Sequence, residues 1–553
     1  MIKIELERLI REAARRAQEA GDLPAFDLPA PALEHPKQPE HGDYATSVAM
    51  QAAKLVRKPP MQVAAAIVKH LPANALLSKA EAAPPGFINL TLSDAWLARQ
   101  VEVILAAGET FGNIDLGQGR KTQVEFVSAN PTGPLHMGSV RNAVLGDTLA
   151  NVLSAAGYDV QREYYVNDRG TQFDNFAASA YARYAQALGV DEPFPEEGYR
   201  GQYMIDMGRQ MAQEFGRRYL ELPKAQATVE LGELALQRTV AEIRADLATI
   251  GVYHDNWFAE RSLYQDGTFE EALAILKKAG MVDSRDGALW FLATKYGAPK
   301  DEVIIRSDGV PGYFASDIAY HYNKFVKRGF QWVIDVWGAD HQGHVPRMKD
   351  MMRALGLNPD DLTVVLYQLV TLKRGGEIVR LSKRTGEIMT LREVVEEVGS
   401  DAVRFFLLSR SADSQMDFDL ELAKQQSAEN PVYYVQYAHA RIASILRKAA
   451  GIDYSAGDVL LLTHPLEKAL IRQMLRLPEI IELAAQRLAP HHLTYYATDL
   501  ATAFHLFYRD CRVVSSEPAD EAITRARLKL VAAVKQVLAR SLRLMGMNAP
   551  ESM

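Results

Sequence analysis

The sequence predicts a Rossmann-like α/β domain with a doubly wound parallel sheet, a small α+β domain before it and an all-α bundle after it. Strand and helix patterns alternate over residues 111–409, which is typical of a parallel sheet. A helical insertion at about residues 171–300 interrupts that rhythm. Residues 1–110 combine helical patterns with a Pro-rich stretch, whereas residues 410–553 keep a helical period throughout.

Short apolar runs in the central region are expected to form the sheet. They are Thr122–Ser128, Val160–Val166, Glu302–Arg306, Trp332–Trp337 and Val364–Val370. Ligands of open parallel sheets bind beyond the carboxyl ends of the strands. The dinucleotide fingerprint and a complete phosphate-loop motif are both missing from the sequence, so a nucleotide is expected at a different strand-to-helix turn.

That turn is expected between the strand Thr122–Ser128 and a helix that begins near His136. The turn residues Asn130–Pro134 separate the two elements. Free N–H groups and the positive end of the dipole favour a phosphate at the start of a helix. Gly138 leaves room for a flat ligand against the backbone. The alternative is a histidine that only caps the helix or packs against it.

A second stretch, Gly375–Gly386, is a glycine-bounded loop with three cations and Ser382 at its centre. A loop of this kind can close a lysine over a triphosphate. The alternative is a solvated basic hairpin, which is the usual fate of a run of charges.

These two stretches together resemble the two signatures of class I aminoacyl-tRNA synthetases. The surrounding sequence resembles the arginyl-tRNA synthetase family in order along the chain. Ser139 stands where the first signature has its second histidine, and Arg380 stands where the second has its first lysine. The stretches that carry the resemblance are VEFVSANPTGPLHMGS, REYYVNDRGTQ, DGVPGYFASDIAYHYNKF, WGADHQGHVPRMK, LSKRTGEIMTLREVVEEVGSDAVRFFLL and ENPVYYVQYAHARI.

The resemblance implies activation of L-arginine with ATP and its transfer to tRNA(Arg), with activation requiring bound tRNA. ATP is expected to arrive with Mg²⁺, and no metal site of the protein's own is expected. The implied catalytic residues are His136, Ser139 and Lys383. The implied ATP-binding residues are His136, Gly138, Ser139, Arg380, Leu381, Ser382 and Lys383.

A pocket for arginine must hold a planar, permanently charged guanidinium, which calls for carboxylates and carbonyls. Asp317 is the best candidate, because Tyr313 lies four residues before it on the same face of a predicted helix. An ordinary helix carboxylate is the alternative. Together, these residues and the resemblance assign Glu125, Ser128, Asn130, Tyr313, Asp317, Tyr320 and Gln342 to arginine binding.

Contacts with tRNA are expected at both ends of the chain, at Tyr44 and at Tyr433, Tyr437 and Arg441. Aromatic rings and arginine planes can stack on unpaired bases. Tyrosines that only pack between helices are the alternative. From residue 430 onward there are 15 Lys or Arg and 11 Asp or Glu, a net charge of +4, whereas the whole chain carries −7. A phosphate backbone is therefore more favourably bound near the C-terminal end.

The composition, 48% hydrophobic and 24% charged, is that of an ordinary globular protein. No apolar run has membrane length and no signal-peptide pattern occurs, so a cytoplasmic location is expected. A monomer is expected as well. The single cysteine, Cys511, excludes an internal disulfide. His341 and His344 have no third ligand spaced to join them, which makes metal binding there unlikely on sequence grounds.

Two other functions remain compatible with parts of the sequence. One is a relative that binds tRNA but charges it poorly, which only Ser139 favours. The other is a nucleotidyltransferase of the same fold that acts on a small substrate. That function leaves the N-terminal module and the tyrosine-rich C-terminal helices without a purpose.

Overall fold

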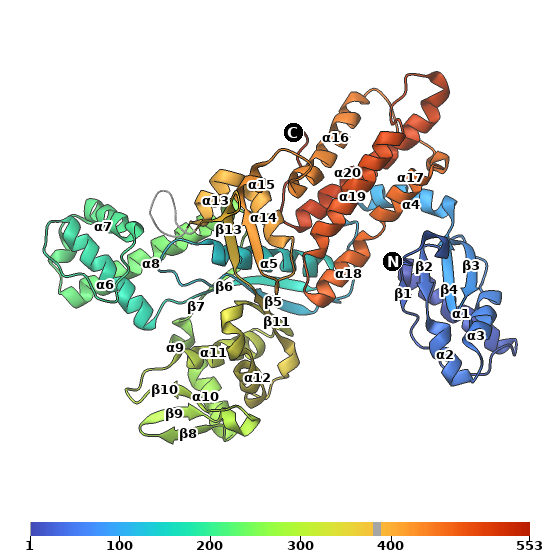
Figure 1. Ribbon diagram of the computed structural model, residues 1–553. Coiled ribbons are helices and arrows are strands. Elements are labelled where there is room, and N and C mark those ends of the chain that lie inside the picture. Colours follow the sequence, from blue (N-terminus) through green and yellow to red (C-terminus); the bar gives the residue numbers. More distant parts are fainter. Residues whose placement is uncertain (1, 380–388) are drawn as a thin grey trace.

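A computed structural model describes residues 2–379 and 389–553. Three parts follow one another along the chain (Figure 1): an N-terminal α+β domain, a region built on a parallel sheet with a helical arm, and a C-terminal bundle of helices. The described helices all lack the combination of length and apolar character that crossing a membrane requires.

The N-terminal part is an antiparallel sheet in the order β1-β2-β4-β3, with helices packed against it. The amphipathic helix α1 buries its apolar face, which includes Leu6, Leu9 and Ile10. Its strands are β1 (Leu33–Glu34), β2 (Tyr44–Thr46), β3 (Leu77–Ala83) and β4 (Phe87–Leu92). Its helices are α1 (Ile2–Glu19), α2 (Val48–Val56) and α3 (Pro60–Lys69). The next helix, α4 (Asp94–Ala107), packs against the C-terminal bundle.

The central part holds a parallel sheet in the order β12-β11-β5-β6-β7. The long helix α5 (Met137–Ala155) follows β5 and packs on the sheet, burying nearly all of its residues. The strands are β5 (Lys121–Glu125), β6 (Asp159–Val166), β7 (Asn256–Ala259), β11 (Trp332–Gly338) and β12 (Leu362–Tyr367). The predicted Rossmann-like parallel sheet is therefore confirmed.

Two strands differ from the expectation. The run Glu302–Arg306, expected in the parallel sheet, forms β10 (Glu302–Ile305), which pairs antiparallel with β9 (Ala288–Phe291) in a separate sheet beside β8 (Val282–Arg285). The edge strand of the main sheet is instead β7, within the region expected to be a helical insertion. Short apolar runs identify strands but carry no information about their partners.

The helical arm consists of α6 (Gly170–Ala187), α7 (Gln202–Phe215) and α8 (Lys224–Thr249), which share a small core of their own. The chain then passes through β7, α9 (Ser262–Gln265) and α10 (Thr268–Lys278). Helix α11 (Tyr313–Tyr322) continues into a π-helical turn, Asn323–Lys327. A 3₁₀ segment, Ala339–His344, leads from β11 into α12 (Val345–Ala354).

A small sheet in the order β14-β13-β15 precedes the C-terminal bundle. Its strand β15 (Met416–Asp419) lies in the range expected to be purely helical and runs parallel to β13 (Val370–Arg374); β14 is Glu377–Ile378. Two short helices, α13 (Leu391–Val398) and α14 (Ser400–Leu408), precede β15 and α15 (Leu420–Lys424) follows it. The bundle contains α16 (Pro431–Lys448), α17 (Pro465–Met474), α18 (Leu477–Arg487), α19 (His492–Asp510) and α20 (Glu521–Leu544).

Candidate active site and tRNA interface

The turn between β5 and α5 is backbone-strained. Val127 and Ser128 both have positive φ values, 67° and 39°. A β-branched residue in this region is a marked outlier, and such strain concentrates at functional sites. Asn142 of α5 holds the turn, because its Oδ1 accepts from Val127 N at 2.7 Å while its Nδ2 donates to Val336 O at 2.8 Å.

His136 is the N-cap residue of α5. Its Nδ1 accepts a hydrogen bond from Gly138 N at 3.2 Å, so the proton of the neutral ring is on Nε2, which can donate to a ligand. The residue is exposed overall, but nearby protein atoms partly desolvate its ring, and this desolvation lowers the pKa of His136. A Cβ on Gly138 would lie 2.9 Å from His136 Cε1, so glycine makes room for this cap. Ser139, half-buried, follows in the first turn.

The chain that leaves the second signature returns to His136. Thr390 forms a backbone bridge with His136, and Leu391 N donates to Leu135 O at 2.9 Å. The expected ATP-binding residues Arg380, Leu381, Ser382 and Lys383 lie outside the described residues. Thr390, seven residues after Lys383, is nevertheless bridged to the histidine that heads α5.

Asp317 lies on α11, one turn after Tyr313. Its side chain is 36% exposed and enclosed on its other sides, and this burial raises its pKa. The guanidinium of Arg347 is 3.6 Å from Asp317 Oδ2, which shows that a guanidinium is accommodated beside this carboxylate. The exposed ring of Tyr313 stands at the start of the same helix. Gln342, in the 3₁₀ segment before α12, and Asn130, in the turn after β5, are both exposed.

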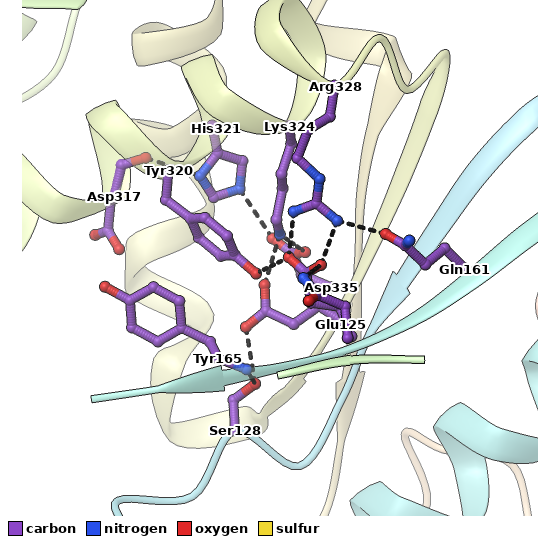
Figure 2. A network of polar contacts seen from close by, with 12 residues as sticks. Glu125, Ser128, Gln161, Tyr165, Asp317, Tyr320, His321, Lys324, Arg328 and Asp335 are labelled. Atoms are coloured by element: carbon purple, nitrogen blue, oxygen red, sulfur yellow. Dashed lines mark hydrogen bonds and ion pairs between the residues drawn. The ribbon is translucent and has the colours of Figure 1, made fainter. Parts of the chain in front are cut away.

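Glu125 and Ser128 meet at the carboxyl end of β5 (Figure 2). Ser128 Oγ donates to Glu125 Oε1 at 2.9 Å and accepts from Tyr165 N at 3.0 Å. Lys324 Nζ donates to Glu125 Oε2 at 2.5 Å and to Asp335 Oδ1 at 2.9 Å. Burial raises the pKa of Glu125 despite the neighbouring ammonium. Because burial disfavours the charged form of Glu125, a cation at the exposed edge of this carboxylate would be favourable.

Tyr320, expected to bind arginine, is buried, and its hydroxyl donates to Glu163 Oε1 at 2.5 Å. Arg328 also donates to this carboxylate. Burial opposes ionisation of Glu163, but the hydrogen bond and charge of Arg328 outweigh it and lower the pKa. The Tyr320 hydroxyl is therefore already engaged, and the ring packs 4.6 Å from that of Tyr165.

Several residues of this region were not singled out from the sequence. Tyr165 lies between Asp317 and Ser128 in Figure 2, and burial raises its pKa. Glu260, after β7, is buried and accepts from Ser316 Oγ at 2.5 Å. Tyr165 belongs to the stretch REYYVNDRGTQ, which carried a resemblance but no assigned role. Lys324 belongs to the stretch DGVPGYFASDIAYHYNKF, which also carried the resemblance without a role for this residue, and its partners lie 199 and 11 residues away.

A cavity of about 810 Å³ opens on the C-terminal bundle. Arg441 lies over the ring of Tyr437 at 4.6 Å and over that of Tyr508 at 5.2 Å. The rings of Tyr433 and Tyr437 are stacked, with centroids 5.9 Å apart. Five cations and one carboxylate line the cavity: Arg441, Arg447, Lys448, Arg509, Arg512 and Asp510. Basic walls with aromatic faces suit single-stranded nucleic acid.

The expectation that the ring of Tyr44 stacks on a base of the tRNA is corrected by the structure. The Tyr44 side chain is only 3% exposed, so it offers no stacking face to a base. Its hydroxyl donates to Glu479 Oε1 of α18 at 2.7 Å, and its ring lies 4.5 Å from that of His35. A tyrosine in a polar loop cannot be told apart by sequence from one that packs against a distant domain.

Three family models match consecutive parts of the chain. The arginyl tRNA synthetase N terminal domain matches residues 5–92, and the class I (R) tRNA synthetase catalytic domain matches residues 100–445. The DALR anticodon binding domain matches residues 435–553. The second match alone covers more than half of the chain.

Whole-chain relatives agree with these matches. The chain is 54% identical over 546 residues to an arginine–tRNA ligase of Dehalococcoides mccartyi (strain CBDB1), covering 98% of both chains. It is 50% identical to an arginine–tRNA ligase of Heliobacterium modesticaldum, covering 98% of this chain and 97% of the other. The arginyl-tRNA synthetase structure from Thermus thermophilus shares the fold, with a TM-score of 0.73, 23% identity and coverage of 99% and 100%. The chain therefore belongs to the arginyl-tRNA synthetase family of class I aminoacyl-tRNA synthetases.

Proposed function

We propose that this chain joins L-arginine to tRNA(Arg) in two steps at the turn between β5 and α5. In the first step a carboxylate oxygen of arginine attacks the α-phosphorus of ATP, and pyrophosphate leaves. In the second step the 2′-hydroxyl of the terminal adenosine of the tRNA attacks the carbonyl carbon, loses its proton, and AMP leaves. The observation that most supports this is the backbone bridge between His136 and Thr390, which joins the two signature regions.

The protein's task in the first step is to position the reactants and to neutralise charge that grows on phosphoryl oxygens. Nε2–H of His136 and the hydroxyl of Ser139 are suitable donors at the N-terminus of α5. The lowered pKa of His136 keeps its ring neutral near neutral pH, so that it acts by hydrogen bonding. Lys383, with Arg380, Leu381 and Ser382, is assigned to the phosphates through the family signature alone.

Arginine is proposed to lie between the carboxylates of Asp317 and Glu125. Its guanidinium would pair with Asp317, beside Tyr313 and Gln342, and its α-ammonium would pair with Glu125, near Ser128 and Asn130. Support comes from Arg347, whose guanidinium already lies beside Asp317. We assign Tyr320 to support of the pocket, because its hydroxyl is bound to Glu163.

Mg²⁺ is proposed to arrive with ATP. Among residues 2–379 and 389–553, no three His, Cys, Asp or Glu side chains are grouped to hold a metal ion. The proposal rests on the general preference of Mg²⁺ for substrate phosphates and water. The monomeric state and the cytoplasmic location stay predictions.

The tRNA is proposed to bind the basic cavity of the bundle, with Tyr433, Tyr437 and Arg441 among its contacts. The supporting observations are the stacked rings and the cations along the cavity wall. We no longer assign Tyr44 to tRNA, because its ring is buried.

The first test is arginine-dependent exchange of pyrophosphate into ATP, measured with and without total tRNA. The other standard amino acids serve as controls. Exchange with arginine alone among them, and only in the presence of tRNA, supports the substrate, the reaction and the dependence on tRNA. Exchange without tRNA would contradict only the predicted dependence of activation on tRNA. Absence of exchange in a protein that still binds tRNA supports the binding-only relative, and Ser139→His is then the variant that should restore activity.

A further inference from the structure

Lys324 is a fully buried ammonium held between two carboxylates (Figure 2). It donates to Glu125 Oε2 at 2.5 Å and to Asp335 Oδ1 at 2.9 Å. Its Nζ lies 4.2 Å from the centroid of the Tyr320 ring, so the remaining direction faces an aromatic face. Burial of an ammonium is costly unless it is paired, and so this arrangement calls for a reason beyond packing.

The helix that carries Lys324 also carries Asp317. Residues 317, 320, 321 and 324 follow the spacing of one helical face, and the π-helical turn Asn323–Lys327 begins just before Lys324. π-helical turns occur frequently at functional sites. One stripe of this helix therefore leads from the carboxylate proposed for the guanidinium to the cation below Glu125.

Exposure differs sharply among the three charged groups. The Glu125 side chain is 11% exposed, whereas those of Lys324 and Asp335 are 0% and 1% exposed. Only Glu125 can therefore touch a substrate. Lys324 holds its Oε2 and Ser128 holds its Oε1, so the carboxylate plane is fixed at both oxygens. The lone pairs that remain are available to a donor at the exposed edge of Glu125.

The other carboxylates of this group are already engaged. Glu163 pairs with Arg328, and Asp335 Oδ2 lies 3.0 Å from His321 Nε2. A further cation would therefore meet the group at the exposed edge of Glu125, where the low local dielectric strengthens the attraction.

We propose that Lys324 is a positioning residue that fixes Glu125 to receive the α-ammonium of arginine, and that this enforces selection for a free α-amino group. The inference rests on the proposed function, because it takes arginine as the substrate. Lys324 itself touches neither arginine nor ATP. Asp335 restrains Lys324, and His321 Nε2 in turn bonds Asp335 Oδ2 at 3.0 Å.

The test compares arginine with desamino-arginine, which lacks only the α-ammonium. The inhibition constant of desamino-arginine and the KM of arginine are measured in charging of tRNA with labelled arginine. The variant is Lys324→Met, which keeps the length of the side chain and removes its charge. The control is Lys327→Met in the same π turn, whose ammonium instead bonds Thr268 and Glu271.

Wild type is expected to prefer arginine by roughly ten- to a hundredfold, the value of one charge-assisted contact. Lys324→Met is expected to lose most of this preference while its KM for ATP stays within about twofold. Lys327→Met is expected to match wild type. An equal weakening of both ligands in Lys324→Met would show general damage to the pocket and would overturn the proposal.

A second variant covers failure of Lys324→Met to fold. Lys324→Met with Asp335→Asn removes one charge of each sign and avoids an unpaired buried carboxylate at position 335. It must show the same loss of preference, and retained preference overturns the proposal. Wild type that charges no arginine at all would refute the proposed function instead, so the two failures are distinguishable.

Discussion

At the scale of single residues, Asp317 shows how burial and exposure combine in one group. Its side chain is partly exposed, yet burial by the surrounding protein raises its pKa. Replacement by Asn keeps the shape and removes the charge. We expect Asp317→Asn to raise the KM for arginine by roughly ten- to a hundredfold, because a charge-assisted contact is lost. Affinity for tRNA, measured by filter binding, should not change.

Asp308→Asn is the matched control, since Asp308 lies exposed in the turn before α11 and only bonds Val310 N. It should leave the KM for arginine unaltered. Arginine kinetics of Asp317→Asn that equal those of wild type would refute the pocket assignment.

The raised pKa of Asp317 also has a consequence for pH dependence. A guanidinium pairs with the ionised carboxylate, so kcat/KM for arginine should fall as pH falls through the raised pKa. Glu125 and Glu260, whose pKa values burial also raises, should contribute to the same acid limb. The limb should lie above the ordinary range of Asp, about 3.9. The fall at acid pH should be weaker for kcat/KM of ATP measured at saturating arginine. An equally strong fall there would argue against arginine binding as its cause.

Sequence predicted some site residues by type but not their contacts. A strand residue that follows a turn, such as Tyr44, and a helix residue such as Lys324 have the same local patterns whether they face solvent or a distant partner. Glu479 lies 435 residues from Tyr44, and Glu125 lies 199 residues from Lys324. Their roles depend on tertiary neighbours, which local periodicity does not encode.

At the scale of elements, the position of α5 depends on a close approach to the end of β5. A Cβ on Gly146 would lie 2.1 Å from Cγ of Phe126, so the helix can pack there only without a side chain. We expect Gly146→Ala to lower the free energy of unfolding by about 1–3 kcal/mol, because overpacking forces the helix away from the strand. Urea denaturation measures this change.

Gly451→Ala is the control, because nothing lies within 4 Å of a Cβ built there. Its stability should stay close to that of wild type. Equal stabilities of the two variants would mean that α5 can shift without cost. Because His136 caps this same helix, Gly146→Ala should also reduce the rate of exchange.

The success of element prediction followed the strength of the local signal. The strand before His136 and the helix after it were predicted correctly, because an apolar run, a turn cluster and a helical period occur in succession. β7 was missed because it has only four residues and follows the long helix α8. β10 was assigned to the wrong sheet because its hairpin partner β9 lies only ten residues upstream, and apolar character does not identify partners.

At the scale of the whole molecule, one buried arginine joins three distant parts of the chain. Arg404 NH1 donates to Ile250 O after α8 at 2.7 Å, and its Nε donates to Met545 O after α20 at 2.5 Å. Its NH2 donates to Asp147 of α5. A Cβ added at Gly546 would lie 2.3 Å from the Arg404 guanidinium, so glycine is needed for this approach. The helix headed by His136 is thus tied directly to the arm and to the bundle.

The basic cavity lies on the same bundle, and Arg441 is at its aromatic wall. We expect Arg441→Ala to weaken tRNA binding and to lower the slope of log affinity against log salt by about one, because one phosphate contact is lost. Binding titrations at several salt concentrations measure both quantities. Arg487→Ala, an exposed cation at the end of α18 outside this cavity, should leave the slope unchanged. An unchanged slope in Arg441→Ala would exclude a phosphate contact at this residue.

The N-terminal domain is attached to the bundle through Glu479 of α18. Its carboxylate accepts from Tyr44 OH at 2.7 Å and pairs with Lys3 at 2.9 Å and His35 at 3.0 Å. Burial disfavours the charged form, but these partners outweigh it and lower the pKa to about 2. A carboxyl group whose pKa is lowered by folding stabilises the protein above its unfolded pKa, and this contribution is lost as pH falls.

We therefore expect Glu479→Gln to be less stable than wild type by about 1–3 kcal/mol above about pH 5, with the difference shrinking as pH falls below about 4.5. Urea midpoints measured between these conditions and about pH 3.5 test this. Glu40→Gln, an exposed acid of the N-terminal domain, is the control and should show no pH-dependent difference. A difference for Glu479→Gln that stays constant over the acid range would mean that docking depends on shape alone. A shrinking difference would show that the charge of this carboxylate contributes to the docking of the N-terminal domain on the bundle that carries the basic cavity.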